Sequence, residues 1–151
     1  MKHRILLITF LLLARVPVSG ANTPVISPAE FTQILALSSA PPVSTAAGNL
    51  RDFMKARGAG LSINTDASRA NETPAAGTIL LGTTADTPML ARWVKEGRLT
   101  ITASEHAGDA YEIALLDGYV ALNGANARAV LYAAFELEDV IAEHEVCRET
   151  L

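Results

Sequence analysis

Three acidic residues near the end of the chain, Glu136, Asp139 and Glu143, repeat at the spacing of one helix face. Two carboxyl groups held about 5 to 10 Å apart across a sugar can cleave a glycosidic bond, one as acid and the other as base or nucleophile. The apolar residues of the same segment, from Val130 to Ile141, lie on the opposite side of the predicted helix. We therefore favour a solvated helix face over a catalytic pair for these carboxylates.

Histidine and cysteine are few in this chain. His144 and Glu145 match the start of the two-histidine zinc motif of helices, but Arg148 stands where the second histidine is required. Cys147 is the only cysteine, which excludes an internal disulfide and leaves an intermolecular bond as an alternative. The other candidates stand alone in the sequence: His3, His106 and Glu138. We predict no catalytic, cofactor-binding or metal site in these residues.

Four aromatic side chains are candidates for stacking on sugar rings: Trp93, Tyr111, Tyr119 and Tyr132. Trp93 shares an apolar helix face with Met89, which indicates a core position. Tyr119 lies on the face of a predicted hairpin opposite its aliphatic residues. We expect that face of the hairpin to look toward solvent or toward a neighbouring domain.

The segment 109–142 predicts a β-hairpin followed directly by a long amphipathic helix. Asp117 and Gly118 tolerate the positive φ that the favoured two-residue turns require. This turn pairs the strands as follows: Leu116 with Tyr119, Leu115 with Val120, Ala114 with Ala121 and Ile113 with Leu122. Four large apolar residues then share one face, and a one-residue slip would scatter them across both faces.

The helix after the hairpin has clear signals at its start. Asn123 and Gly124 end the second strand, and Asn126 is placed to cap the helix. Its inner face repeats at helical spacing through Val130, Ala134, Leu137 and Ile141. Such a stripe is typical of a helix that lies on a sheet with its other face in water.

Upstream, a candidate first strand covers residues 31–37, and the two prolines at 41 and 42 mark a break. A helix is predicted over residues 45–57, with Ser44 or Thr45 as its cap and Gly58 as its stop. Residues 62–76 are small and polar, which predicts a surface loop.

Residues 78–81 form a short apolar run between glycines, which predicts a strand buried on both faces. Asp86 or Thr87 then caps a helix that begins at Pro88 and ends at Gly97. Alternation over residues 99–103 predicts a further strand. The order of elements predicts an α+β fold, a small mixed β-sheet with helices packed against it.

Residues 1–20 have the features of a secretory signal peptide, with basic residues, an apolar run of ten and small residues before Ala21. That run is shorter than the roughly 20 residues a membrane span needs, so a retained anchor is the less favoured alternative. Cleavage removes three basic residues and no acidic ones, so the net charge falls from −4 to −7. The acidic remainder argues against nucleic acid and anionic membrane surfaces as partners. We expect a secreted or periplasmic protein.

The hairpin-to-helix segment resembles the N-terminal non-catalytic domain of exported glycoside hydrolases, of the α-glucuronidase and β-hexosaminidase type. The matching residues are Gly118, Val120, Leu122, Gly124, Asn126, Arg128, Leu131, Tyr132, Phe135 and Leu137. Residues 50–58 and 77–82 fit the early helix and second strand of the same family, so the resemblance covers about residues 45 to 142. The chain departs from the family at Ala129 and Ala133, where glycine is usual.

The resemblance implies the fold of a β-hexosaminidase N-terminal-like domain that packs against a catalytic barrel and carries no active site of its own. It divides the chain into a signal peptide (1–20), an extended leader with a candidate strand (21–43), the accessory domain (44–142) and a tail (143–151). In the tail, residues 146–148 are expected to begin a strand that leads into the barrel.

Two functions follow from this reading. The favoured one is an accessory domain, as a fragment of a longer secreted carbohydrate-degrading enzyme whose barrel is its partner. The alternative is a free-standing exported module that binds glycans or another protein. An independent enzyme ranks third, because no set of residues in the sequence outlines an active site.

Overall fold

The computed structural model describes residues 27–104 and 106–149. The predicted signal peptide and its cleavage site lie outside the described residues. In chain order the elements are a 3-10 helix (Pro28–Glu30), β1 (Gln33–Ala36), α1 (Pro41–Lys55), β2 (Ser62–Asn64), a second 3-10 helix (Ala67–Asn71), β3 (Thr78–Gly82), α2 (Pro88–Lys95), β4 (Tyr111–Leu116), β5 (Tyr119–Gly124) and α3 (Ala127–Glu149).

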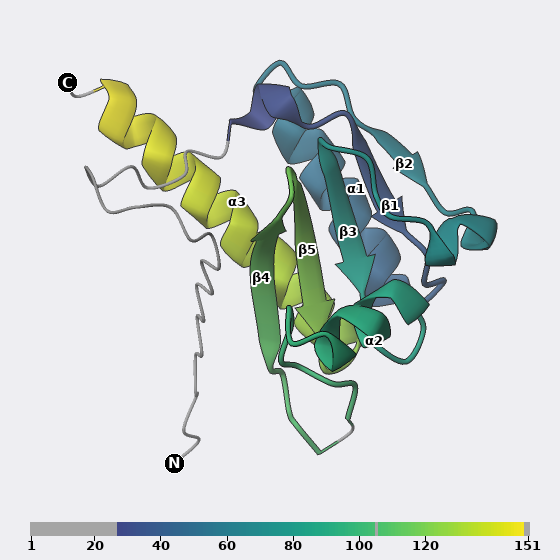
Figure 1. Ribbon diagram of the computed structural model, residues 1–151. Coiled ribbons are helices and arrows are strands. Elements are labelled where there is room, and N and C mark those ends of the chain that lie inside the picture. Colours follow the sequence, from purple (N-terminus) through teal and green to yellow (C-terminus); the bar gives the residue numbers. More distant parts are fainter. Residues whose placement is uncertain (1–26, 105, 150–151) are drawn as a thin grey trace, which may run out of the picture.

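The strands form one mixed sheet in the order β2-β1-β3-β5-β4 (Figure 1). β2, β1, β3 and β5 are parallel to one another, and only β4 runs antiparallel, because a two-residue turn joins it to β5. The predicted α+β fold with a small mixed sheet is confirmed. β1 lies between β2 and β3, so the sheet includes residues upstream of residue 44.

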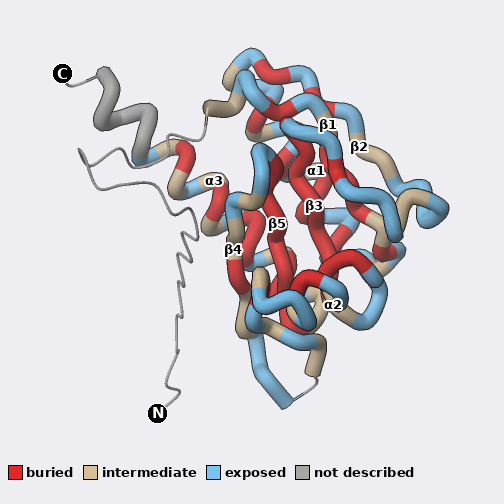
Figure 2. The backbone as a smooth tube through the Cα atoms, in the orientation of Figure 1, coloured by how far each residue is buried: buried red, intermediate tan, exposed pale blue. Residues whose placement is uncertain are grey.

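Helices cover both faces of the sheet. α1 and α3 pack on one face, and the shorter α2 packs on the other (Figure 1). β3 and β5 are buried along their whole length, as the continuous apolar run in β3 predicted. Figure 2 shows this burial concentrated in the central strands and in the inward sides of the helices.

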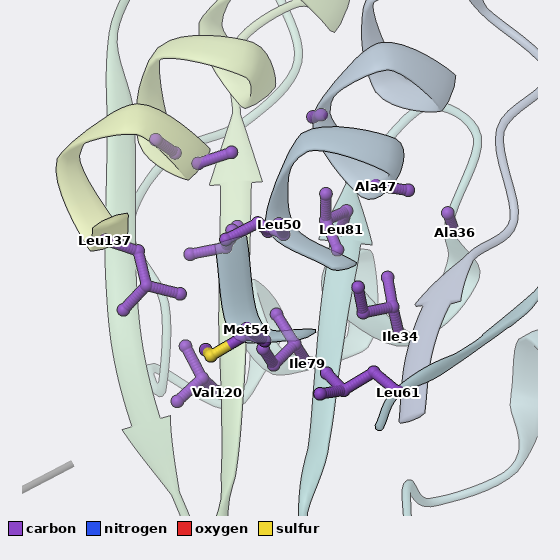
Figure 3. Packing of buried hydrophobic residues seen from close by; sticks show 14 of the residues in the cluster. Ile34, Ala36, Ala47, Leu50, Met54, Leu61, Ile79, Leu81, Val120 and Leu137 are labelled. Atoms are coloured by element: carbon purple, nitrogen blue, oxygen red, sulfur yellow. The ribbon is translucent and has the colours of Figure 1, made fainter. Parts of the chain in front are cut away.

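The larger apolar cluster lies between the sheet and the pair α1 and α3 (Figure 3). Strand residues at every second position enter it, which is the side-chain period of a strand. Its main members are Ile34, Leu50, Met54, Ile79, Leu81, Val120, Leu122 and Leu137. Each of these side chains is at most 1 % exposed, so this cluster is the main source of stability.

The intervening strand residues form a second cluster under α2. Leu35, Leu80 and Ala121 meet Met89, Leu90 and Trp93 there. All buried members of the two clusters lie between Phe31 and Ile141, so both halves of the apolar core are formed within this part of the chain.

The hairpin has the predicted register. Leu116 pairs with Tyr119 and Ile113 with Leu122, and the two pairs between them also match the prediction. Asp117 and Gly118 adopt φ values of 46° and 87°, the turn that fits the twist of the flanking strands. Local turn chemistry therefore set the geometry of β4 and β5.

The prediction that the prolines at 41 and 42 interrupt the chain before a helix was wrong. α1 begins at Pro41, so both prolines lie in its first turn, and Ala40 rather than Ser44 or Thr45 is the N-cap. The first helical residues need no backbone N–H partner within the helix, so proline is tolerated there.

Two further predictions upstream of the hairpin need correction. Residues 62–76 are not all loop, because Ser62–Asn64 form β2 and Ala67–Asn71 form a 3-10 helix. Residues 99–103 form no strand. The backbone N–H groups of Thr100 and Ile101 bond to the Glu112 carboxylate instead of to a neighbouring strand.

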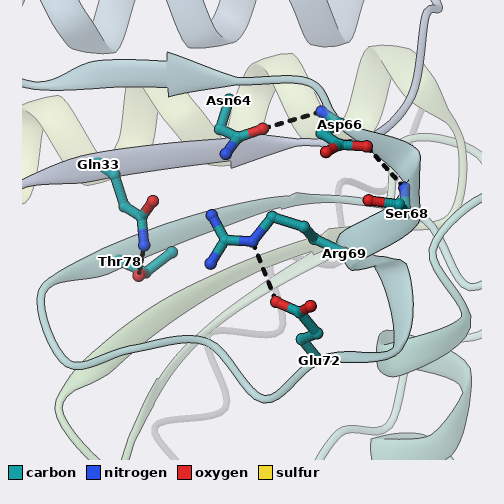
Figure 4. Close-up of polar contacts among 7 residues, drawn as sticks. All are labelled: Gln33, Asn64, Asp66, Ser68, Arg69, Glu72 and Thr78. Atoms are coloured by element: carbon teal, nitrogen blue, oxygen red, sulfur yellow. Dashed lines mark hydrogen bonds and ion pairs between the residues drawn. The ribbon is translucent and has the colours of Figure 1, made fainter.

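Polar side chains fix the segment that joins β2 to β3 (Figure 4). Asn64 accepts a hydrogen bond from the backbone of Asp66, and Asp66 caps the 3-10 helix by accepting one from Ser68, both at 2.9 Å. Arg69 pairs with Glu72 at 3.1 Å. This segment therefore carries its own turn chemistry and adds nothing to the apolar clusters.

α3 is capped as predicted and runs further than predicted. Asn126 Oδ1 accepts a hydrogen bond from Ala129 N at 3.0 Å. The helix continues to Glu149, so the expectation of a strand beginning at residues 146–148 was wrong. Ala129 and Ala133, where the resembled family has glycine, are both fully buried.

Candidate functional site

The polar groups at the carboxyl ends of the central strands form the first place to look for a site, because open α/β sheets bind ligands there. Glu112 on β4 and Asn123 on β5 are both buried at this end. Thr100 and Ile101 lie over them, in the segment that follows α2.

The Glu112 carboxylate is occupied by protein donors. It accepts hydrogen bonds from Thr100 N at 3.0 Å, Thr100 Oγ1 at 2.9 Å, Ile101 N at 2.8 Å and Asn123 Nδ2 at 2.8 Å. The Asn123 amide also donates to the Ile101 carbonyl at 2.7 Å. A general acid or base must reach the substrate, and this carboxylate is instead the anchor of the 99–103 segment. Sequence reasoning missed Glu112, whose one signal was a charge inside an otherwise apolar strand.

The polar side chains in the turn after β3 likewise bond to other groups of the protein. Asp86 Oδ1 accepts from Thr83 N and Thr83 Oγ1, each at 2.9 Å, and from Thr87 Oγ1 at 3.2 Å. Thr84 Oγ1 accepts from Ala103 N at 2.7 Å. Thr87 is the N-cap of α2 and Pro88 its first residue, as predicted. These contacts hold α2 and the 99–103 segment on the sheet.

The acidic residues of α3 differ in their surroundings. Asp139 and Glu143 are exposed, whereas Glu136 is half-buried beside Tyr111 of β4. Burial raises the pKa of Tyr111, and the nearby Glu136 carboxylate raises that pKa further. The three carboxylates are therefore not one equivalent solvated row.

The sequence predicted no functional role for Glu138, yet the environment of its carboxyl group is unusual. Burial raises the pKa of this carboxyl, the Asp139 charge adds to the rise, and Arg57, in the turn just after α1, opposes it. Its Oε1 atom is buried and has no hydrogen-bond partner among the described residues.

This gives a prediction for Glu138→Gln. A carboxyl whose pKa is raised on folding stabilises the folded state only while it is protonated, and that contribution is lost as pH rises through the folded pKa. We expect the glutamine variant to be more stable than wild type at pH 7, with the difference shrinking as pH falls through the raised pKa of Glu138 and vanishing below the ordinary pKa of 4.5. Chemical denaturation across pH measures this. Glu143→Gln, which removes an exposed carboxylate from the same helix, is the matched control.

Histidine and cysteine do not assemble into a site within the described part of the chain. His106 is exposed in a turn. The backbones of His144 and Cys147 lie in α3, and their side chains are outside what is described. Within residues 27–104 and 106–143, whose side chains are described, there is no cluster of three or more His, Cys, Asp or Glu placed to hold a metal ion. None of the helices in the described part of the chain has the length and apolar character of a membrane span.

The aromatic residues divide into buried and exposed. Trp93 is in the core, where it stacks on Tyr119 with ring centroids 5.3 Å apart. The expectation that Tyr119 looks toward solvent or a neighbouring domain was wrong, because α2 covers this face of the hairpin. Arg98 lies 5.5 Å from the Trp93 ring and pairs with Asp117 at 2.6 Å.

Three large apolar side chains remain at the surface: Leu115 on β4 and Tyr132 and Phe135 on α3. They are 40 to 44 % exposed, in contrast to the buried residues of both clusters. A surface that carries such residues suits contact with another protein segment or, through Tyr132, with a sugar ring.

Comparison with known proteins shows a similarity of fold. No family model and no curated protein sequence matches this chain. Among solved structures, it is similar to a GH138 enzyme targeting pectin rhamnogalacturonan II, with a TM-score of 0.51 and 12% sequence identity. The match covers 76% of this chain and 13% of that enzyme, so the chain spans only a small part of its length. The fold of this protein therefore also occurs within a large glycoside hydrolase.

Proposed function

We propose that this chain is the N-terminal accessory domain of a secreted carbohydrate-degrading glycoside hydrolase. In this proposal the domain resembles those of α-glucuronidases and β-hexosaminidases and packs against a catalytic barrel. The two carboxylates that cleave the glycosidic bond belong to the barrel. The predicted signal peptide carries the protein to the periplasm or the exterior.

One observation carries the proposal. The fold match takes in most of this chain but 13% of a glycoside hydrolase, so the shared fold is a minor part of that enzyme. A domain that makes up a small share of a large enzyme is better suited to an accessory role than to being the catalytic domain. Function does not follow from fold alone, so the sequence resemblance around Gly124, Asn126 and Arg128 is the second support.

The described carboxylates agree with an accessory role. The Glu112 carboxylate accepts hydrogen bonds from Thr100, Ile101 and Asn123 and so stabilises the fold. Glu136 interacts with Tyr111. The exposed Tyr132 and Phe135 of α3 are suited to contact with a neighbouring domain.

A free-standing exported module is the second candidate, and the exposure of Tyr132 favours it. An exposed tyrosine ring can stack on a sugar and still donate a hydrogen bond through its hydroxyl. Glycan or protein binding would then be the whole activity of the chain.

Reading the gene past the codon for Leu151 separates the two candidates. We expect an open frame of several hundred codons with paired Asp or Glu residues at barrel strand ends. A stop codon immediately after Leu151 would contradict the accessory-domain proposal. A glycan array probed with residues 21–151, with Tyr132→Ala as the matched control, would then test the second candidate.

A further inference from the structure

The two edge strands of the sheet differ in how their outer edges are protected. β2 is only three residues long, and two of the three, Ser62 and Asn64, are polar. β4 has six residues, Tyr-Glu-Ile-Ala-Leu-Leu, without lysine, arginine or proline, and its one charged residue, Glu112, is buried. Natural proteins usually protect a long edge strand with charge, proline or a covering segment. β4 has none of these among its own residues.

The backbone of β4 presents a regular set of free groups. Ala125 N donates to the Ala110 carbonyl at 2.9 Å, which shows that the even-numbered residues of β4 face β5. The N–H and C=O groups of Tyr111, Ile113 and Leu115 therefore point away from the sheet. No turn or loop of residues 27–104 and 106–149 bonds to these three positions.

The side chains along this edge are apolar and incompletely covered. Tyr111 and Ile113 are half-buried, and Leu115 is 44 % exposed. All three lie on the face that α3 covers, and α3 contacts both β5 and β4. Figure 1 shows α3 continuing past β4, so a strand added at this edge would be backed by a helix.

Tyr132 lies on the same flank. It precedes Glu136 by one helical turn, and Glu136 interacts with Tyr111 of β4. Two of the three exposed large apolar residues, Leu115 and Tyr132, thus border the open edge of β4.

We propose that β4 pairs antiparallel with β4 of a second copy of this chain, about a two-fold axis at Ile113. This register places Tyr111 opposite Leu115 of the second copy and uses all three outward backbone positions. Aromatic and aliphatic residues opposite each other stabilise antiparallel strands. A register centred on Glu112 would bring two buried carboxylates together, which disfavours it.

The charges at the ends of β4 fit this register. It places Asp109 opposite Asp117 of the second copy. Asp109 already pairs with Arg128 at 2.7 Å, and Asp117 with Arg98 at 2.6 Å. Each end of the seam then carries two acidic and two basic groups, so the strands meet without net repulsion. The inference does not depend on the proposed function, because it rests on the edge of the sheet alone.

Sedimentation of residues 21–151 over a range of concentrations tests the proposal, since this segment contains both complete apolar clusters. We expect a dimer that dissociates on dilution and whose dissociation constant rises at least about tenfold in Leu115→Lys. Phe135→Lys is the matched control, because Phe135 is 41 % exposed but lies three residues before Glu138, on the flank toward α1. A monomer at every concentration up to millimolar would overturn the proposal, as would equal weakening by both variants.

Cross-linking tests the register. Residues opposite each other at a hydrogen-bonded site have Cα atoms about 5.5 Å apart, close enough for a short thiol-reactive cross-linker to join a cysteine of each copy. In a Cys147→Ser background, Ile113→Cys should form a covalent dimer with such a cross-linker, whereas Phe135→Cys should not. A dimer that forms without cross-linking at residue 113 would overturn the two-fold at Ile113.

Discussion

Replacing Glu112 with alanine is expected to lower the free energy of unfolding by about 3 kcal/mol or more. The substitution leaves the backbone N–H groups of Thr100 and Ile101 and the Asn123 amide without their shared acceptor. Each buried donor that loses its partner costs about 1 to 3 kcal/mol, and relaxation of the 99–103 segment toward water recovers part of this. Urea denaturation measures the loss.

Two further measurements make this result specific. Hydrogen exchange at the Thr100 and Ile101 amides should become much faster in Glu112→Ala, while β5 amides keep their protection relative to the new global stability. Glu112→Gln keeps one acceptor oxygen and should lose less. Glu96→Ala removes an exposed carboxylate of a surface pair and should change stability by less than about 1 kcal/mol. Unchanged exchange at Thr100 and Ile101 in Glu112→Ala would show that the carboxylate does not anchor the segment.

Replacing Gly124 with alanine should cost about 2 to 3 kcal/mol. A Cβ atom at this position would lie 2.7 Å from Val130 N and 2.8 Å from Asn126 O. Both are backbone atoms at the start of α3, so the added methyl group can be accommodated only by moving the helix away from β5. Thermal and urea denaturation of the variant measure the effect.

Gly48→Ala is the matched control for that prediction. Gly48 lies inside α1, and a Cβ atom there would meet nothing within 4 Å. Alanine favours helix over glycine by about 1 kcal/mol, so this variant should be at least as stable as wild type. If Gly124→Ala were also as stable as wild type, close contact between β5 and α3 would not be what requires glycine at position 124.

What the proposed β4 dimer would join depends on whether a catalytic domain follows this one. If a catalytic domain follows this one, the dimer proposed here joins two enzymes through their accessory domains. If none follows, the same edge joins two free-standing modules. The gene sequence and the sedimentation experiment decide these points separately.

The sequence by itself determined the elements whose geometry is local. The Asp117-Gly118 turn fixed the register of β4 and β5, because both residues tolerate the positive φ that a type I′ hairpin turn requires at its two central positions. Asn126 capped α3, and Thr87 with Pro88 began α2, because the caps depend on residues within one helical turn. Apolar periodicity also identified Trp93 as a core residue.

Only the tertiary structure decided what depends on residues far apart in the chain. Alternation over residues 99–103 suggested a strand, yet the acceptor for those amides is a carboxylate on β4 rather than another backbone. Tyr119 became a core residue because α2 returns over the second face of the sheet. The position of β1 between β2 and β3 and the open edge of β4 likewise follow from strand order, which local propensity does not encode.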